Sequence, residues 1–277
     1  MKNNKTFSYP ILQVIGTLDV GGAENVFIDV CNLINDRGED VTALFTRSPG
    51  ILAKKLSKGV KRVSLDRKFR FSLSAVAKIV VILNKFKIVH VHSRYNLILI
   101  YIVSILNPFK KYKIIFHDHY GIDTKKKWWL KIISRKIDAY IGVSLDLKNY
   151  AIENLRVKNG NNFVLPNIRF NKINKPFIKS INVEKIKFVH VANIFRNKNL
   201  EFALSLISKL SKSRNVSLTI YGAAVDKDYF KELKQIIHEK KIEKLVNFIH
   251  DEHNISTILK NYDIGLCTSK AESGPLS

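Results

Sequence analysis

The chain has 277 residues, of which 46% are hydrophobic and 10% aromatic, and it carries a net charge of +24. This length and apolar content predict one large or two ordinary globular domains and exclude a disordered chain. Two cysteines are too few for a disulfide framework, the longest apolar run is about half of the ~20 residues that span a bilayer, and the polar N-terminus does not resemble a signal peptide.

Strands and helices alternate along the first half of the sequence. The apolar run Ile11–Ile15 predicts a buried strand that ends at Gly16, and the apolar spacing over residues 24–37 predicts an amphipathic helix with Gly38 as its C-terminal cap. The apolar run at residues 96–106 favours a buried helix. Further strands are predicted at residues 40–45, 60–65, 88–92, 113–117, 139–144 and 162–166.

A polar stretch at residues 169–184 interrupts the alternation and is typical of a linker. The alternation then resumes and predicts a second set of elements. Strands are predicted at residues 186–192, 216–222, 245–250 and 264–269, and helices at Leu200–Leu210, 229–240 and 255–261. Near-continuous apolar strands that alternate with helices favour parallel sheets covered on both faces.

The predicted fold class is therefore α/β, with two Rossmann-like, doubly wound domains. The expected division is an N-terminal domain at residues 1–170, a linker at 171–184 and a C-terminal domain at 185–277. With three or four strands, the second domain is smaller than an ordinary sheet of about five or six, so it is expected to be incomplete.

The loop after the first predicted strand carries Gly21 and Gly22 just before the first predicted helix. Glycines at that place let a ligand approach the backbone, and the N–H groups of a helix N-terminus favour an anion. The dinucleotide fingerprint GxGxxG is absent, and taken alone the two glycines favour a tight turn without ligand.

Four histidines fall in two pairs at the ends of neighbouring predicted strands. His90 and His92 are two residues apart and share one face of a strand, as do His117 and His119. No third and fourth ligands have convincing zinc spacing, so the sequence predicts no metal site. His119, the last of the four, is expected to reach the carboxyl edge of the sheet, where it could act as a base or a hydrogen-bonding group.

In the second half, Arg196 and Lys198 follow a strand and precede a helix. Two cations beside a helix N-terminus favour a diphosphate, and a solvated basic turn is the simpler alternative. In the final loop, Glu272 could bind sugar or ribose hydroxyls, and the backbone near Gly274 and Leu276 could hold phosphate. An exposed loop carboxylate is the simpler interpretation of Glu272.

The net charge indicates an anionic partner: nucleic acid, anionic lipid or a phosphorylated substrate. The lysines are spread along the chain, so a composition that follows a genomic bias explains the charge as well. Basic residues gather at 110–113 and 125–131, and the second cluster includes Trp128 and Trp129, a composition typical of a membrane-interface anchor.

Taken together, these segments resemble the retaining glycosyltransferases of family four, which have the glycosyltransferase B fold. The similarity rests on motifs that occur in the family's order over nearly the whole chain. These motifs are GGAE, HVHS, HDHYG, IGVS, LPN, ANIFRNKN and SKAESGPLS. The resemblance implies a nucleoside-diphosphate sugar as donor substrate, no cofactor, a donor site in the C-terminal domain and an acceptor site in the N-terminal domain.

The resemblance also implies roles for single residues. His119 and Glu272 match the family's catalytic positions, His119 as the histidine near the transferred sugar. The implied donor-binding residues are Gly21, Gly22, Asn193, Arg196, Lys198, Gly274, Pro275 and Leu276. Asn193 stands where the family more usually has an arginine, which leaves Lys198 as the firmer half of the basic pair.

Glu272 matches the first glutamate of a two-glutamate motif whose second glutamate would fall beyond Ser277. The sequence is therefore expected to be cut inside the donor-binding motif and to have little or no transferase activity as it stands.

The functional prediction is transfer of a sugar to a polysaccharide or lipid-linked acceptor in cell-surface glycan biosynthesis. The expected location is the cytoplasm, with docking on the inner face of the cytoplasmic membrane through the basic surface and Trp128–Trp129. Two alternatives stay open: a nucleotide-sugar epimerase of the same fold and, suggested by charge alone, a basic nucleic-acid-binding protein.

Overall fold

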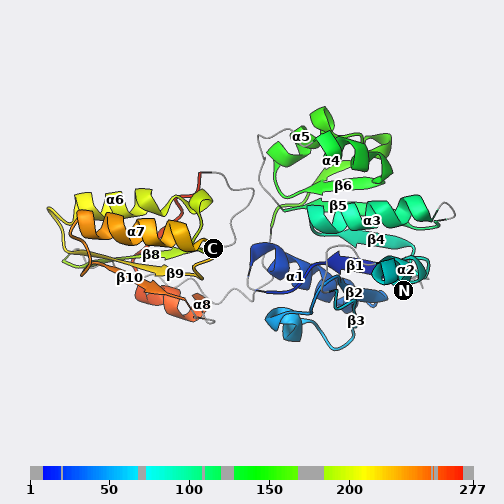
Figure 1. Cartoon of the computed structure of the whole chain (residues 1–277). Helices are drawn as coiled ribbons and strands as arrows, with labels where there is room; N and C mark the ends of the chain where they lie inside the picture. Colours follow the sequence, from blue (N-terminus) through cyan, green and yellow to red (C-terminus); the bar gives the residue numbers. More distant parts are fainter. Residues whose placement is uncertain are drawn as a thin grey trace, which may run out of the picture. The chain divides into compact units, whose positions relative to one another are not determined.

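In the computed structural model, the chain forms two compact units, each built on its own parallel sheet (Figure 1). The structure describes residues 9–19, 21–67, 73–107, 110–119, 128–167, 184–250, 252 and 255–270. The predicted linker lies outside these residues, apart from its last residue, Glu184.

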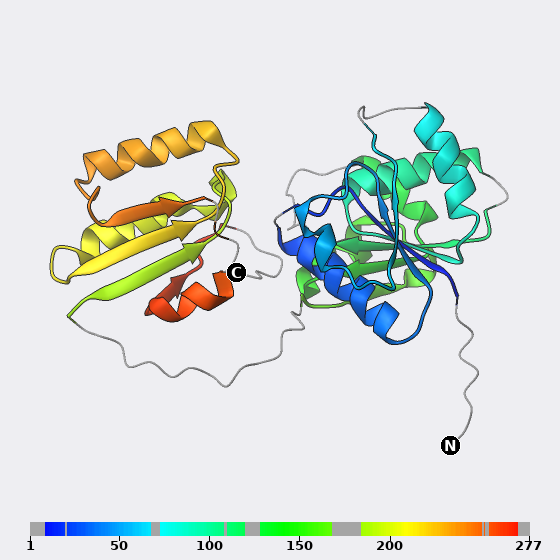
Figure 2. The same ribbon diagram turned by 90° about the horizontal axis from the view of Figure 1, so that it is seen from below.

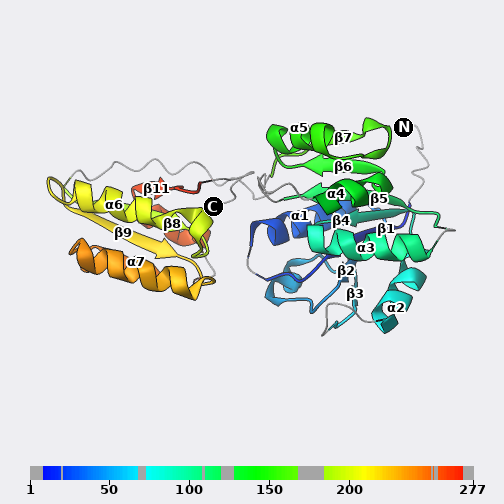
Figure 3. The same cartoon turned by 45° about the horizontal axis from the view of Figure 1, so that its top comes forward.

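The first unit contains a seven-stranded sheet in the order β3-β2-β1-β4-β5-β6-β7, and every neighbouring pair is parallel. Figure 3 shows these strands in sequence from β7 at the top to β3 at the bottom. The strands are β1 Ile11–Ile15, β2 Val41–Phe45, β3 Lys61–Ser64, β4 Ile88–Val91, β5 Lys113–Asp118, β6 Ala139–Gly142 and β7 Asn162–Val164. The helices are α1 Gly22–Asp36, α2 Leu73–Leu83, α3 Arg94–Leu106, α4 Trp128–Ile133 and α5 Leu145–Asn154.

The two faces of this sheet have separate cores because side chains alternate along each strand. Leu12, Val14 and Val91 point into a cluster that is completed by residues of α2, α3 and α4. Ile15 and Phe45 belong to a second cluster with the apolar side chains of α1. The second cluster covers the β1–β2 side of its face, and polar side chains lie on the β4–β5 side of the same face.

The second unit contains a four-stranded parallel sheet in the order β10-β9-β8-β11. Its elements are β8 Ile186–Val191, α6 Leu200–Leu210, β9 Val216–Tyr221, α7 Lys227–Glu239, β10 Val246–Ile249, α8 Ile255–Ile258 and β11 Ile264–Leu266. Helices α6 and α7 pack on one face of the sheet, and α8 lies on the other (Figures 1 and 2).

Both sheets change direction at one point. The chain winds outward from β1 through β2 to β3 and then crosses to β4, and it repeats this path from β8 through β9 and β10 to β11. In open α/β sheets, ligands bind beyond the carboxyl ends of the strands at such a switch point. Ligand binding is therefore expected at the loops that follow β1 and β4 in the first unit, and β8 and β11 in the second.

Three helix ends of the first unit carry residues that suit capping positions. Gly38, with φ of 79°, follows the C-terminal end of α1, as its predicted role as a cap requires. Ser93 and Ser144 begin α3 and α5, since each hydroxyl accepts a hydrogen bond from the backbone N–H three residues later. The predicted α/β class and the two Rossmann-like sheets are confirmed.

Candidate functional site

Two loops meet at the switch point of the second unit. The hydroxyl of Thr268, just past β11, donates to the carbonyl of Lys198 at 2.8 Å, and the N–H of Lys270 donates to the carbonyl of Asn197 at 2.9 Å. The ring of His190 on β8 lies 3.1 Å from the Thr268 oxygen and donates to it through Nε2. The loop after β8 and the loop after β11 therefore form one continuous polar surface.

Arg196 lies on this surface but is tied to its own unit. Its guanidinium is ion-paired with Glu232 of α7 and lies over the ring of Tyr229, 5.3 Å from the ring centroid. About half of each side chain in the ion pair is exposed, so the contact is a surface pair that an incoming anion can compete for.

Lys198 and Asn193 have different roles in the loop after β8. The ammonium of Lys198 lies 5.6 Å from the ring centroid of Phe195, at the end of the short 3-10 helix Arg196–Lys198. The amide oxygen of Asn193 accepts from the N–H of Ala223 at 3.2 Å and thereby ties the loop after β8 to the loop after β9. Lys198 presents a cation beside the start of α6, whereas Asn193 braces the loop.

Gly222 allows the ends of β8 and β9 to approach each other. Its φ is 154°, and a Cβ atom there would lie 2.1 Å from the carbonyl oxygen of Ala192. Only glycine fits this position without a backbone shift. The ring of His250, past β10, donates to the Gly222 carbonyl at 2.8 Å, so a single glycine links three strand ends.

The glycine loop of the first unit surrounds a carboxylate. Gly21 precedes α1 in an extended conformation, and Gly22 is the first residue of the helix. The carboxylate of Glu24 folds back over Gly21, where a Cβ atom would lie 2.1 Å from Oε2. Burial, and to a smaller extent the charge of Asp19, raises the pKa of Glu24. An anion at this helix N-terminus would have to displace that carboxylate.

The four histidines gather on one face of the first sheet. The rings of His90 and His92 have centroids 4.3 Å apart, those of His117 and His119 are 4.2 Å apart, and the β4 and β5 pairs stack against each other. Gln13 pairs with His90 across β1 and β4 and so faces the same way. His119 is partly exposed and the other three are buried, so His119 lies nearest the surface.

All four imidazoles are held neutral at pH 7. Burial is the main cause, and it lowers the pKa of His90 to about 3 and that of His119 to about 4. Burial and the neighbouring imidazoles also lower the pKa of His92 and His117. His119 can therefore exchange hydrogen bonds, but it does not offer a positive charge to a ligand.

Three of the histidines approach the geometry of a metal centre. One ring nitrogen each of His90, His92 and His117 lies within 4.8 Å of the others. Both ring nitrogens of His92 are already hydrogen-bonded, one to Gln13 and one to His119. Of these three described histidines, His90 and His117 have buried ring nitrogens without a hydrogen bond and His92 has none, which falls short of a zinc ligand set. The absence of a metal stays a prediction.

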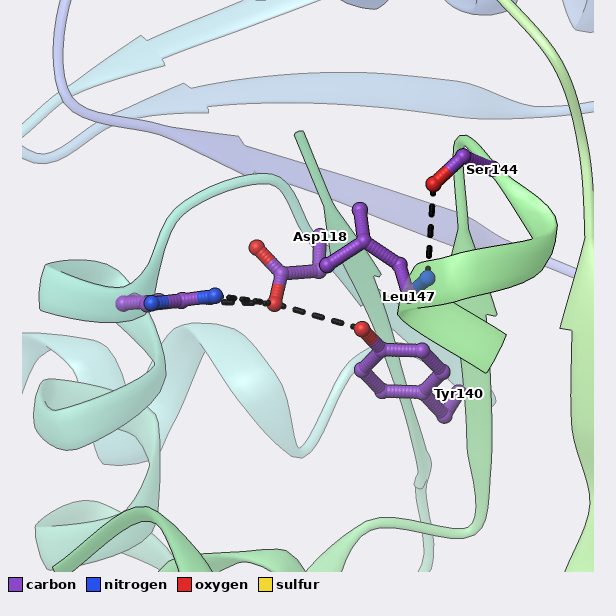
Figure 4. A network of polar contacts seen from close by, with 5 residues as sticks. Asp118, Tyr140, Ser144 and Leu147 are labelled. Atoms are coloured by element: carbon purple, nitrogen blue, oxygen red, sulfur yellow. Dashed lines mark hydrogen bonds and ion pairs between the residues drawn. The ribbon is translucent and has the colours of Figure 1, made fainter. Parts of the chain in front are cut away.

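A buried ion pair holds the ends of β5 and β4 together. Arg94, at the start of α3, donates to the carboxylate of Asp118 at 2.8 Å through Nη2 and at 3.3 Å through Nε. The hydroxyl of Tyr140 on β6 points at the same carboxylate and donates to it at 3.2 Å; Figure 4 shows this contact beside the Ser144 cap of α5. Because Asp118 stands between His117 and His119, the pair fixes the backbone that carries both rings.

A family model described as Glycosyltransferase Family 4 matches residues 20–168, more than half of the chain. The chain belongs to glycosyltransferase family 4. A second model, described as Glycosyl transferases group 1, matches residues 171–277 of this family 4 chain. No curated protein sequence matches it.

Solved structures share the fold of this family 4 chain. Anabaena HepE, crystallised with UDP and glucose, has a TM-score of 0.75 at 18% identity over 96% of this chain and 76% of its own. TarM of S. aureus has a TM-score of 0.75 at 13% identity over 96% and 81%. The lipopolysaccharide outer core galactosyltransferase WaaB has a TM-score of 0.63 at 16% identity over 96% and 75%. The two units therefore have the sheets of the glycosyltransferase B fold.

Within this glycosyltransferase fold, the predicted site residues fall into three groups. The first unit holds Gly21, Gly22 and His119 at its switch-point edge, and the second unit brings Asn193, Arg196 and Lys198 together at its own. The remaining predicted residues lie outside the described part of the chain: Glu272, Gly274, Pro275 and Leu276.

The sequence analysis of this family 4 chain missed the partners of the predicted residues. Gln13 is the one polar residue in the buried strand β1, and Arg94 is a charge at the start of an otherwise apolar helix. A polar or charged residue in such a place needs a partner, and this signal could have identified both. Thr268 had no comparable signal because its role depends on the register of β8 and β11.

Proposed function

We propose that this family 4 chain binds a nucleoside-diphosphate sugar at the carboxyl edge of β8 and β11 and transfers the sugar with retention of configuration. The acceptor is a polysaccharide or a lipid-linked glycan in cell-surface glycan biosynthesis, and no separate cofactor takes part. The observation that carries the proposal is the polar surface formed by the two switch-point loops, with Lys198 at its centre. Anabaena HepE was solved with UDP-glucose, and S. aureus TarM with UDP, which supports a nucleotide-sugar donor.

On this surface, the proposed role of the cations is to stabilise the departing diphosphate. Breaking the bond between sugar and diphosphate leaves extra negative charge on the departing phosphate, and a fixed cation stabilises that charge. Lys198 is the principal residue for this role because it lies in the loop held by Thr268. Arg196 adds to it once the diphosphate competes with Glu232 for the guanidinium.

In the first unit, His119 is proposed to face the transferred sugar. A neutral imidazole suits hydrogen bonding to a sugar hydroxyl, and burial keeps the ring neutral at pH 7. Gly21 and Gly22 are proposed to face the donor phosphates, which requires Glu24 to swing away from the start of α1. Glu272, Gly274, Pro275 and Leu276 complete the proposal as sugar and phosphate contacts.

Replacing Lys198 with alanine is expected to weaken donor binding about 10-fold to 100-fold. A charge-assisted contact to phosphate contributes roughly 1.5–3 kcal/mol, and the variant loses one such contact. Isothermal titration with UDP, GDP and their common sugar conjugates measures the change. Lys234→Ala is the matched control, since Lys234 lies on α7 over the Phe230 ring and removes the same charge away from the loop. Equal affinities for both variants would refute the role of Lys198.

The same protein distinguishes the alternatives. Salt-dependent binding of DNA without binding of any nucleotide sugar would favour a nucleic-acid-binding protein. Interconversion of a nucleotide sugar without an acceptor would indicate an epimerase.

Helix α4 has an outer face suited to an anionic membrane surface. On this face, Trp128 is 73% exposed and Ile132 is 42% exposed. Lys131 and Arg135 are exposed as well, and their spacing of three and seven residues from Trp128 places them on the same side. Trp129 differs from the prediction for the pair, because it packs against the core of the first unit. No helix in the described part of the chain is long and apolar enough to cross a bilayer. We propose peripheral docking through this face at the inner side of the cytoplasmic membrane.

Replacing Trp128 with alanine is expected to weaken binding to vesicles that contain phosphatidylglycerol by roughly 10-fold. The indole buries its apolar body in the interface, and the adjacent cations attract the headgroups. Cosedimentation with vesicles measures the partition. Phe202→Ala is the control, because Phe202 is 59% exposed on α6 of the other unit. If both variants bind vesicles as the unaltered chain does, α4 is not the docking face.

A further inference from the structure

Gln13, His92 and His119 form a hydrogen-bonded chain across three neighbouring strands. The amide oxygen of Gln13 lies 2.8 Å from Nε2 of His92, and Nδ1 of His92 lies 3.0 Å from Nε2 of His119. Gln13 and His92 are buried, and His119 is the member nearest the surface. The chain therefore connects a residue in the middle of β1 to the proposed sugar-facing ring.

The position of each proton follows from the chemistry of the groups. A neutral imidazole has one N–H and one lone pair, and a carboxamide oxygen only accepts. His92 must donate to Gln13 through Nε2, which leaves the lone pair on its Nδ1. That lone pair must accept from His119, so Nε2 of His119 carries the hydrogen and Nδ1 carries the lone pair.

We propose that Gln13 is a positioning residue that acts through His92 to fix His119 in the tautomer with hydrogen on Nε2. The proposal rests on the proposed function, in which His119 faces the transferred sugar. In this tautomer, the second nitrogen of His119 accepts hydrogen bonds and does not donate them. A sugar hydroxyl that meets this nitrogen must therefore donate its proton, which restricts how the sugar ring can be oriented.

The surrounding structure supports a fixed tautomer. The side chain of Asn167 also hydrogen-bonds His119. The Arg94–Asp118 ion pair holds the strand ends that carry His92 and His119, so the two rings keep their register.

A metal ion is the competing explanation for the same histidines. A metal bound by His90, His92 and His117 would need one ring nitrogen of His92, and both already have partners in the chain described above. Gln13 accepting from Nε2 would suit a metal on Nδ1, but the bond to His119 would then be lost. The hydrogen-bonded chain Gln13–His92–His119 and a metal centre are mutually exclusive, so one experiment can distinguish them.

The test is nitrogen NMR of the full chain labelled with ¹⁵N-histidine, at about pH 7.5. Long-range proton–nitrogen correlations identify the protonated nitrogen of each ring, and His92→Gln and His119→Gln assign the signals. The expected result is hydrogen on Nε2 of both rings. Hydrogen on Nδ1 of His119 would overturn the proposal, and so would stoichiometric Zn²⁺ binding that shifts the His92 signals.

Two variants of Gln13 test whether this residue determines the tautomers of His92 and His119. Gln13→Leu leaves the Nε2–H of His92 without an acceptor, and we expect both rings to shift towards hydrogen on Nδ1. Gln13→Glu keeps an acceptor oxygen and is expected to keep both tautomers. Unchanged tautomers in a folded Gln13→Leu protein would overturn the role of Gln13. Should that variant not fold, the spectrum of the unaltered chain still decides the tautomer.

Titration with UDP-sugars tests the proposed donor binding separately from the proposed tautomers. The predicted tautomers without donor binding would support the positioning role of Gln13 and count against the proposed function. Donor binding together with the opposite tautomer of His119 would support the proposed function and refute the positioning role of Gln13.

Discussion

Lowering the pH from about 7.5 to about 5 is expected to destabilise the first unit by several kcal/mol. The folded state keeps His90 and His119 neutral down to pKa values of about 3 and 4, whereas an unfolded imidazole takes up a proton below 6.5. Between these values the unfolded state binds more protons, so stability falls as the pH falls. At pH 5, each buried histidine contributes roughly 2 kcal/mol to this loss.

Urea unfolding followed by tryptophan fluorescence measures this effect, because Trp128 and Trp129, the only two tryptophans, both lie on α4 of the first unit. The double variant His90→Asn, His117→Asn should flatten the pH dependence, since it removes two of the four titrating groups. His238→Gln is the control, because His238 is exposed in the second unit and pairs with Glu243. Equal stability at both pH values would contradict the neutral, buried cluster.

Replacing Asp118 with alanine is expected to cost about 3–5 kcal/mol of folding stability. The carboxylate is fully buried, and its removal leaves the charge of Arg94, which is 10% exposed, without its balancing partner. The hydroxyl of Tyr140 loses its acceptor as well. Urea unfolding at about pH 7.5 measures the loss, with Asp40→Ala as control, since the exposed Asp40–Lys61 pair contributes no more than roughly 1 kcal/mol.

The double variant Arg94→Met, Asp118→Leu separates charge from packing. Removing both partners avoids an unbalanced buried charge, so the double variant should be more stable than Asp118→Ala alone. A double variant that is less stable than Asp118→Ala would show that packing around the pair, and not its charge balance, determines the cost.

Much of the fold could be predicted from the sequence because its strands are apolar and short. Ile11–Ile15 and Leu200–Leu210 match the structure residue for residue. Some element boundaries differ from the predicted ones. Helix α1 begins at Gly22, two residues before the predicted start, because the glycine contributes no apolar side chain to the periodic pattern. The strand predicted at residues 162–166 ends at Val164, just before Leu165 and Pro166.

The candidate site could be predicted only in part. The loops that carry Lys198 and His119 were identified because each follows a buried strand, and parallel strands deliver their carboxyl ends to one edge. The partners of these residues depend on strand order, which periodicity does not determine. Gln13 and His92 are 79 positions apart, and His190 and Thr268 are 78 apart, so only the sheet topology brings them together.

The central claim, donor binding at the switch point of β8 and β11, is tested most directly by isothermal titration of the chain with UDP-glucose. The account predicts saturable binding that Lys198→Ala weakens at least about 10-fold and Lys234→Ala leaves unchanged. Binding of UDP-glucose that is unaffected by loss of Lys198 would place the donor elsewhere and contradict the account.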